Sequence, residues 1–563
     1  MKITFFNIVG PLLFLLQMGI TCSLFAQGDD KDKKKDWTDG ELEDVQIEII
    51  KEREITLPKV NRNFEKIPPR ANEPIIPPIT YDFRTFNFQA PEVKPSIKPL
   101  RLKQESSSSV YGGYVTGGFG NYSTPYAEAF LNSRKDKNKL IGAHAWFKSS
   151  GKGPIDDENS ASGTSGATVY GKTFGEYLSF SGKVGFETYK THFYGYPQDE
   201  EPADRSSIKQ FYNIFSLGGS VSNTKSSDFS YQLGADFSHL NDHYDAQETI
   251  VDLGFKSAYR LDEETSVDIN ATYSIISRKD ELVDAKPRNL FQVNGAYVFI
   301  PMEGLSVKAG LTVAYENDTL DNKNIHVFPD LHATYTLSPT VDLVGALTGG
   351  VDKVSLHSLS RENWWVEPNI PIYHTNRNFE FLIGINARLS KQIEAHAGLS
   401  AANLKNLYYF VNSPGDQSMF TTVYDNGTTK RNNIYGSISY AQSEKAKFML
   451  RADYYTYTTD NIKEAWHKPT YSVTANALYN IYDKILLKAD LIMQGGMKAF
   501  DQETQETIKL DGAFDLNARA EYLFSPSFSF FVELNNITSS KYPLFYHYPV
   551  RSLQVLGGVT WSF

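Results

Sequence analysis

The sequence predicts an all-β protein, a transmembrane antiparallel β-barrel of about 22 strands with an N-terminal proline-rich tail on the periplasmic side. Three observations lead to this fold class. Apolar and polar residues alternate with period two in many segments after residue 109. The connections between these segments alternate between short and long. The final segment alternates in the same way and ends in Trp561 and Phe563.

The composition excludes several other classes of protein. The 563 residues are 41% hydrophobic and 13% aromatic, which is too apolar for a disordered chain. A formal net charge of −10 argues against nucleic-acid binding, because phosphate attraction needs an excess of Lys and Arg. A single cysteine excludes a disulfide scaffold. After residue 26, no run approaches the roughly 18 apolar residues that a membrane-spanning helix requires.

Residues 1–26 are predicted to be a signal peptide. Lys2 precedes the mostly apolar stretch 5–25, and Ala26 provides a small residue for cleavage. A buried N-terminal helix is the alternative, while the residues around Cys22 match a lipid-attachment motif poorly. We therefore expect export through a cleaved signal peptide.

Residues 27–108 are predicted to form a separate tail. Nine prolines between Pro58 and Pro99 leave no room for a regular helix or a central strand. One segment, 42–50, alternates like a strand and would pair either with the sheet edge of a partner or with the protein's own barrel or tail. Its candidate partner-binding residues are Leu42, Val45, Ile47, Ile49 and Ile50.

The region 109–563 is predicted to be the barrel. In 264–277, for example, Ile269 and its alternate neighbours are apolar, whereas Asp268 and Asn270 are polar, so the two faces of the strand differ. A soluble β-sandwich shows the same local alternation, but it does not sort its connections by length as a transmembrane barrel does. The 22 expected strands are 110–118, 125–133, 139–149, 166–174, 177–187, 207–222, 228–240, 246–260, 264–277, 289–299, 304–316, 325–337, 340–349, 376–390, 392–412, 431–442, 445–456, 466–480, 483–495, 508–523, 527–537 and 551–563.

The C-terminal residues carry a family resemblance. The stretch 531–542, followed by Arg551 and by 557–563, resembles the closing hairpin of TonB-dependent receptors. The resemblance implies an outer-membrane barrel of 22 strands and assigns 42–50 to the box that pairs with TonB. Trp561 and Phe563 would form the C-terminal insertion signal, a role compatible with a place in the interfacial aromatic girdle.

The sequence departs from that family in one respect. About 58 residues separate Ile50 from Ser109, and they contain no motif of a folded plug domain. The chain therefore resembles a plugless, Bacteroidota-type relative. Because barrels of this size are normally plugged, we expect the lumen to be filled by the tail, by inward-folded loops such as 350–375, or by a second protein.

No catalytic, cofactor-binding or metal-ligating residues are predicted, and we do not expect an enzyme. Segment 239–245 holds two His and two Asp, and 156–158 and 318–321 hold acidic residues, but solvated loop charge explains them better than a metal does. An aromatic cluster in a long outer loop would either bind a sugar or a surface protein, or pack that loop over the barrel mouth. Its residues are Trp364, Trp365 and Tyr373.

Two classes of function remain open. The first is solute uptake or transport across the outer membrane, with TonB coupling in doubt because no plug is evident. The second is a non-transporting barrel subunit of a larger cell-envelope assembly, which recruits partners through its tail. The expected partners are outer-membrane lipid, a periplasmic protein at 42–50, and surface or periplasmic subunits, but no nucleic acid. We expect the protein in the cell outer membrane.

Overall fold

The computed structural model describes residues 112–133, 136, 138–196, 204–224, 227–283, 286–318, 323–443 and 445–563. The predicted signal peptide (1–26), the predicted tail (27–108) and its segment 42–50 lie outside the described residues, so they stay predictions.

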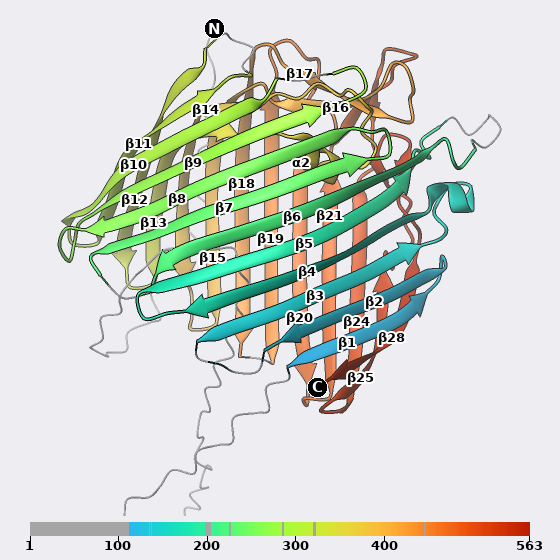
Figure 1. Cartoon of the computed structure of the whole chain (residues 1–563), viewed down its shortest axis with the longest axis horizontal. Coiled ribbons are helices and arrows are strands. Elements are labelled where there is room, and N and C mark those ends of the chain that lie inside the picture. Colours follow the sequence, from blue (N-terminus) through green and yellow to red (C-terminus); the bar gives the residue numbers. More distant parts are fainter. Residues whose placement is uncertain are drawn as a thin grey trace, which may run out of the picture. The chain divides into compact units, whose positions relative to one another are not determined.

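Twenty-two long strands form one closed antiparallel sheet, as the sequence predicts (Figure 1). Each pairs with the next along the chain, and three two-stranded hairpins lie apart from the sheet. The barrel strands are β1 (Gly113–Gly120), β2 (Thr124–Asn132), β3 (Lys139–Ser150), β4 (Ser162–Phe174), β5 (Leu178–His192), β6 (Lys209–Asn223), β7 (Phe229–Asp242), β8 (Gln247–Arg260), β9 (Ser266–Lys279), β10 (Arg288–Met302), β11 (Leu305–Glu316), β12 (Ile325–Ser338), β13 (Val341–Asp352), β14 (Thr375–Arg388), β15 (Ile393–Lys405), β18 (Thr428–Gln442), β19 (Ala446–Thr458), β20 (Tyr471–Ile481), β21 (Ile485–Gly495), β24 (Ala513–Ser525), β25 (Phe528–Asn535) and β28 (Gln554–Ser562).

The barrel closes where its first and last strands meet. β1 and β28 pair antiparallel, with Val115 opposite Trp561 and Tyr114 opposite Ser562. Figure 1 shows the blue β1 beside the red β28. Closure leaves no unpaired sheet edge, which a strand in hydrocarbon could not tolerate.

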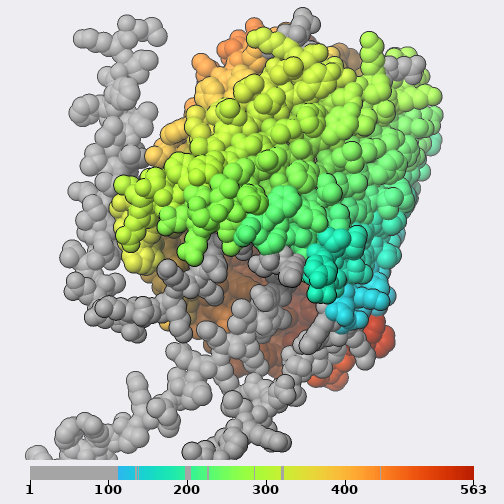
Figure 2. Space-filling view, turned by 60° about the vertical axis from the view of Figure 1, so that its left-hand side comes forward, coloured from blue at the N-terminus to red at the C-terminus, as the bar shows by residue number. Residues whose placement is uncertain are grey.

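The outer face of the wall is apolar and the inner face is polar. On β5, Phe180, Val184 and Phe186 are 54%, 46% and 50% exposed on the outside, whereas Lys183 and Glu187 alternate with them on the inside. Figure 2 shows the outer surface over the green and yellow strands. An apolar surface that surrounds a polar interior is the arrangement of a barrel embedded in lipid. No helix in the described part of the chain is long and apolar enough to cross a membrane.

The connections sort by length, as predicted. Turns such as 175–177 and 482–484 are short, whereas 353–374, 406–427 and 536–553 at the opposite end are long. Both barrel termini lie at the short-turn end. The long connections contain elements that the alternation pattern did not reveal: η2 (Asp157–Ser160), α2 (Leu356–Glu362), β16 (Tyr408–Asn412), β17 (Phe420–Tyr424), β22 (Lys498–Phe500), β23 (Thr507–Lys509), β26 (Pro543–Phe545) and β27 (Tyr548–Pro549).

Two expected strands differ from the structure in a way that has a physical reason. The predicted strand 392–412 is divided into β15 and β16, because Asn406 adopts a φ of 56° that interrupts the ladder. The predicted strand 508–523 begins only at Ala513, since its first residues belong to the small hairpin β22–β23.

Candidate functional site

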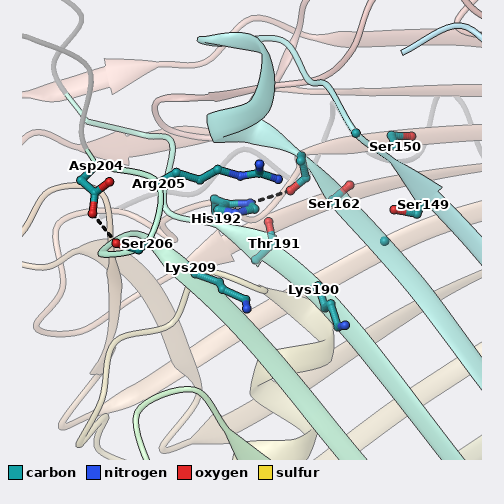
Figure 3. Close-up of a pocket in the computed structure, with 13 residues that line it drawn as sticks. Ser149, Ser150, Ser162, Lys190, Thr191, His192, Asp204, Arg205, Ser206 and Lys209 are labelled. Carbon is teal, nitrogen blue, oxygen red and sulfur yellow. Dashed lines mark hydrogen bonds between the residues drawn. The ribbon is translucent and has the colours of Figure 1, made fainter. Parts of the chain in front are cut away.

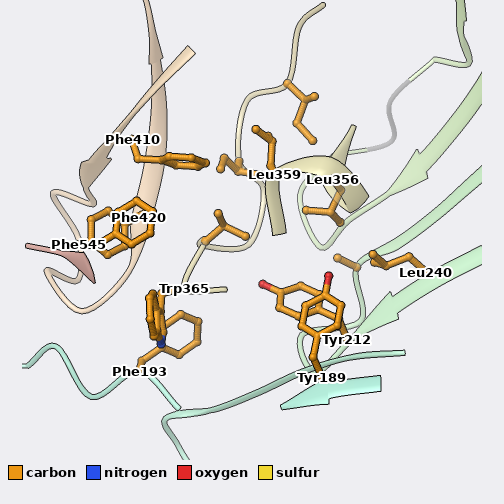
Figure 4. Packing of buried hydrophobic residues seen from close by; sticks show 14 of the residues in the cluster. Tyr189, Phe193, Tyr212, Leu240, Leu356, Leu359, Trp365, Phe410, Phe420 and Phe545 are labelled. Atoms are coloured by element: carbon orange, nitrogen blue, oxygen red, sulfur yellow. The ribbon is translucent and has the colours of Figure 1, made fainter. Parts of the chain in front are cut away.

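A hydrophobic core lies at the long-loop end of the barrel. We call this unit the loop cap; it comprises residues 193–196 and 204–208, connections 353–374, 406–427, 459–470 and 536–553, and the strand ends that they contact. Figure 4 shows its side chains converging from several elements. The buried members are Tyr189, Phe193, Tyr194, Ile208, Tyr212, Ile214, Leu240, Ala246, Val354, Leu356, Leu359, Trp365, Val366, Ile370, Ile372, Phe410, Phe420, Phe545 and Tyr548.

The cap residues come from well-separated parts of the ring. One group belongs to β5, β6 and β7, another to the connections that flank β14 and β15, and a third to the connection between β25 and β28. These groups are about a third of the circumference apart in the strand order. A single core that joins them must extend across the mouth of the barrel.

Helix α2 lies in the connection 353–374. Ser355 begins it with a capping box, in which its side chain accepts from the Ser358 amide and Ser358 bonds back to the Ser355 amide. Leu356 and Leu359 lie three residues apart on one face and are buried in the cap. The helix therefore presents its apolar face to the cap core.

Trp365 is at the centre of the cap and is 6% exposed. Its Nε1 donates to the Thr191 hydroxyl at 3.1 Å and to the His192 carbonyl at 3.0 Å. Its ring centroid lies 4.0 Å from that of Tyr548, and Tyr194 makes an edge contact. These contacts tie loop 353–374 to β5 and to the last long connection.

Glu248, near the start of β8 in the barrel wall, binds the backbone of loop 353–374 with its side chain. The Glu248 carboxylate, 1% exposed, accepts from the amides of Leu356 and His357 at 2.8 and 2.9 Å. These amides are in the first turn of α2, where they have no partner within the helix. Glu248 therefore fixes the start of α2 to the wall.

Two arginines on neighbouring strands hold the rest of the loop. Arg278 donates to the Ile370 carbonyl at 2.5 Å and pairs with Asp280, which accepts from the Asn369 amide at 2.9 Å. Arg288 donates to the Val354 carbonyl at 2.9 Å.

Arg288 also pairs with Asp318, with Nε to Oδ2 at 2.6 Å. Burial would raise the pKa of Asp318, but Arg288 beside it keeps that pKa below its ordinary value. Glu248, Arg278 and Arg288 thus form three buried polar anchors on adjacent strands, and the two arginines are also ion-paired. They give the loop the fixed geometry of a core element.

Two buried histidines of the cap are held neutral. The Nδ1 atom of His374 accepts from Arg288 at 2.9 Å and from the Val354 amide at 3.1 Å. The Nε2 atom of His467 accepts from the Tyr546 amide at 3.3 Å, while its Nδ1 bonds to the Phe410 carbonyl. Burial lowers the pKa of each histidine to about 4, and Arg288 adds to the effect at His374.

We predict that the cap loosens in acid. An unfolded cap would bind a proton at each histidine below its ordinary pKa of about 6.5, whereas the folded cap resists protonation down to about 4. Stability should therefore fall as the pH drops through that window, by up to about 3 kcal/mol per histidine. Protease sensitivity of the loops at pH 7.5 and pH 4.5 measures the effect.

The matched control is the double variant His374→Gln and His467→Gln. Glutamine also offers an acceptor oxygen but does not titrate, so the difference between the two pH values should shrink. An undiminished difference in this variant would assign the acid effect to other groups.

Beneath the cap, a chamber of about 330 Å³ opens on the polar inner face of the wall. It is lined by Trp146, Tyr189, Trp364 and the ion pair of Arg361 with Glu187. The rings of Tyr189 and Trp364 lie 5.4 Å apart. Aromatic faces beside an arginine and a carboxylate suit a polar organic solute, because they combine stacking with directional hydrogen bonds.

The predicted aromatic residues occupy different places in this region. Trp364 faces the chamber, Trp365 is in the cap core, and Tyr373 packs edge-on against Tyr424 with centroids 5.1 Å apart. The assignment of these residues to a partner-binding site stays a prediction.

Trp561 and Phe563 lie at the barrel terminus. They are 54% and 39% exposed on the outer face, with ring centroids 4.7 Å apart. This position fits both an interfacial aromatic and an insertion signal, so the latter stays a prediction. Leu42, Val45, Ile47, Ile49 and Ile50 are outside the described residues.

In segment 239–245, His239 and Asp242 have structural roles. His239 bonds to the Thr249 hydroxyl at 2.9 Å, whereas Asp242 accepts from the amides of Tyr244 and Ala246. Among the residues that the structure describes, no group of three or more His, Cys, Asp or Glu is arranged to hold a metal ion.

Comparisons with known proteins bear on the barrel. No protein-family model matches the sequence, and no curated protein does. The FrpB iron transporter from Neisseria meningitidis matches in structure with a TM-score of 0.61 and 11% identity, over 81% of this chain and 82% of that one. The siderophore receptor PirA from Acinetobacter baumannii gives 0.61 and 9%, over 80% of each chain.

The ferric-catecholate import receptor Fiu from E. coli K12 gives a TM-score of 0.60 and 9% identity, over 81% of this chain and 82% of that chain. The chain has the barrel fold of TonB-dependent receptors. The resemblance drawn from the C-terminal sequence is confirmed at the level of this fold. These neighbours are named as a transporter and as import or siderophore receptors, and none of the three is named as an enzyme.

Proposed function

We propose that this chain is an outer-membrane barrel for solute uptake whose outer mouth is closed by its own loop cap. The observation that carries the proposal is the chamber under the cap, where Trp146, Trp364 and Arg361 face a polar lumen. Ion pairs such as Lys308 with Asp330, at 2.9 Å, line the wall and suit a water-filled interior. The transport roles named for the structural neighbours support the same class.

In this proposal the cap is the outer gate. A solute would enter only when loop 353–374 moves away, and it would then meet the chamber. The predicted tail, 27–108, is expected on the periplasmic side of the barrel. The proposal does not depend on coupling to TonB through 42–50, since the sequence shows no plug motif on which TonB could pull.

A second candidate is a barrel subunit of a larger envelope assembly. The three buried polar anchors of loop 353–374 favour it, because a lid that opens readily has few buried contacts. A permanently closed barrel would serve as a membrane platform, with the tail recruiting partners. Signal-peptide cleavage, export and the location in the outer membrane are common to both candidates.

In a chain whose residues 355–373 are replaced by a short Gly-Ser turn, so that the cap no longer closes the mouth, we predict that removal of 27–108, with the signal peptide retained, raises single-channel conductance in planar bilayers if the tail occupies the lumen. Conductance equal to that of the same cap-excised chain with 27–108 present would remove this role of the tail. The matched experiment is Ile47→Pro, which disrupts strand pairing at 42–50 but leaves the length of the tail unchanged.

Affinity purification of the full chain and of Ile47→Pro from outer membranes separates the two candidates. A stoichiometric partner that is lost in the variant would favour the assembly and fix 42–50 as its contact. A solitary barrel in both preparations, with solute-dependent current, would favour uptake.

A further inference from the structure

A hollow of about 480 Å³ lies on the outer wall, at the ends of β3 to β6 that carry the long loops (Figure 3). We call it the outer-wall hollow. Its lining includes several cations and hydroxyl groups, and it shares Thr191 and His192 with the part of β5 that Trp365 of the cap contacts. The residues used below are Ser149, Lys190, Arg205, Ser206 and Lys209.

The strand register places this hollow directly above the apolar band of the wall. On β5, Val184 and Phe186 face outward, and Lys190 continues the same alternate face toward the loops. On β6, Leu217 and Phe215 are followed on the same face by Lys209. The lysines are therefore at the level where hydrocarbon gives way to lipid headgroups.

Lys190 and Lys209 lie close enough to act on one ligand. Lys190 is opposite Phe211, and Lys209 is two residues from Phe211 on β6. Such diagonal neighbours have backbones roughly 7–8 Å apart, so two flexible ammonium groups can meet at one anion. Neither ammonium forms an ion pair with any residue that the structure describes, and Lys209 lies 5.8 Å from the Phe211 ring centroid.

The remaining lining residues complete an anion site. Ser149 on β3 and Ser206 in the β5–β6 connection supply hydroxyl groups, and Arg205 adds a guanidinium that is paired with Glu158 at 2.9 Å. Asp204 is the one carboxylate among the residues that line the described hollow, and it accepts a hydrogen bond from Ser206. With Arg205 paired to Glu158, Lys190 and Lys209 still outnumber Asp204 among the described lining residues, which favours an anionic ligand.

We propose that the outer-wall hollow binds the phosphate group of a membrane glycolipid in the outer leaflet. A phosphate monoester suits it because the two lysines and the neighbouring hydroxyls can bind its oxygens while the acyl chains lie on the apolar band below. This inference goes beyond uptake and holds whether or not the barrel transports a solute. It requires only that the long-loop end faces outward.

The test is titration of the purified full chain in detergent, read by native mass spectrometry. The probes are diphosphorylated lipid A, the same lipid without phosphate, and inorganic phosphate. We expect the phosphorylated lipid to bind, and the double variant Lys190→Gln and Lys209→Gln to weaken binding about tenfold, because two charge-assisted contacts are lost.

The matched control is Lys279→Gln with Lys430→Gln. These exposed lysines are at the same end of the barrel on β9 and β18, outside the hollow. This control variant should bind the phosphorylated lipid as tightly as the unmodified chain does. Equal losses in the two double variants would overturn the site in favour of general surface charge. Equal binding of the dephosphorylated lipid would overturn the role of phosphate, and binding of inorganic phosphate as tight as that of the lipid would overturn the lipid as its source.

Discussion

Replacement of residues 355–373 by a short Gly-Ser turn is expected to raise single-channel conductance about tenfold, because an unobstructed lumen of this size conducts as a wide pore. The cut is possible without disturbing the wall, since Asp352 of β13 and Thr375 of β14 are paired in register. The variant removes α2 and Trp365 together, and with them the part of the core that crosses the mouth. Planar-bilayer recordings measure the change.

The control for barrel integrity carries the same Gly-Ser turn in place of Asp483, between Tyr482 and Lys484 at the short-turn end. It should leave conductance unchanged. The cap excision is made both in the full chain and in a chain without 27–108. An increase in either background shows that the cap is a barrier. No increase in both, from a barrel that still shows its β-sheet content, would mean that loop 353–374 does not close the mouth.

The wall was predictable because lipid imposes a simple rule on it. Each strand must alternate between an apolar outer face and a polar inner face, so the pattern in segments such as 264–277 identified both the strands and their number. Turn length then identified the two ends. Local exceptions followed from single backbone conformations such as that of Asn406, which no alternation pattern contains.

The cap was not predictable in the same way, because loop cores have no period. Arg278 and Arg288 alternate like any other polar residue on the inner face, and nothing in their spacing shows that they bind the backbone of a distant loop. The available indications were the length of 350–375 and its aromatic cluster. These identified the correct loop, but they left open whether Trp365 binds a ligand or packs in a core.

The chamber and the outer-wall hollow were missed for a related reason. Trp146 and Arg361 are far apart in the sequence and meet only when the loop folds back into the barrel. Lys190 and Lys209 are brought together by the β5–β6 register, although 18 residues lie between them in the sequence. The sequence pattern shows which face of a strand such residues occupy. Which of them meet at one site is determined only by the folded barrel.

Arg288→Met is expected to destabilise the cap by about 3–5 kcal/mol, because it leaves the buried carboxylate of Asp318 without its cation. It also removes the donor to the Val354 carbonyl and one donor to His374. The barrel wall should persist, since its ladder does not depend on this side chain. Two measurements in detergent separate unfolding of the cap from unfolding of the barrel. Limited proteolysis reports on the loops, and tryptophan fluorescence reports on unfolding.

A second variant tests whether the uncompensated charge causes this loss. Arg288→Met combined with Asp318→Asn should recover much of the stability, since no buried charge remains unpaired. The exposed pair of Lys183 with Asp236, at 3.1 Å, provides the comparison, and Lys183→Met should cost less than about 1 kcal/mol. If the double variant is no more stable than Arg288→Met alone, the hydrogen bonds to the loop backbone carry the anchoring. The cap would then depend on the position of the guanidinium donors and not on its charge balance.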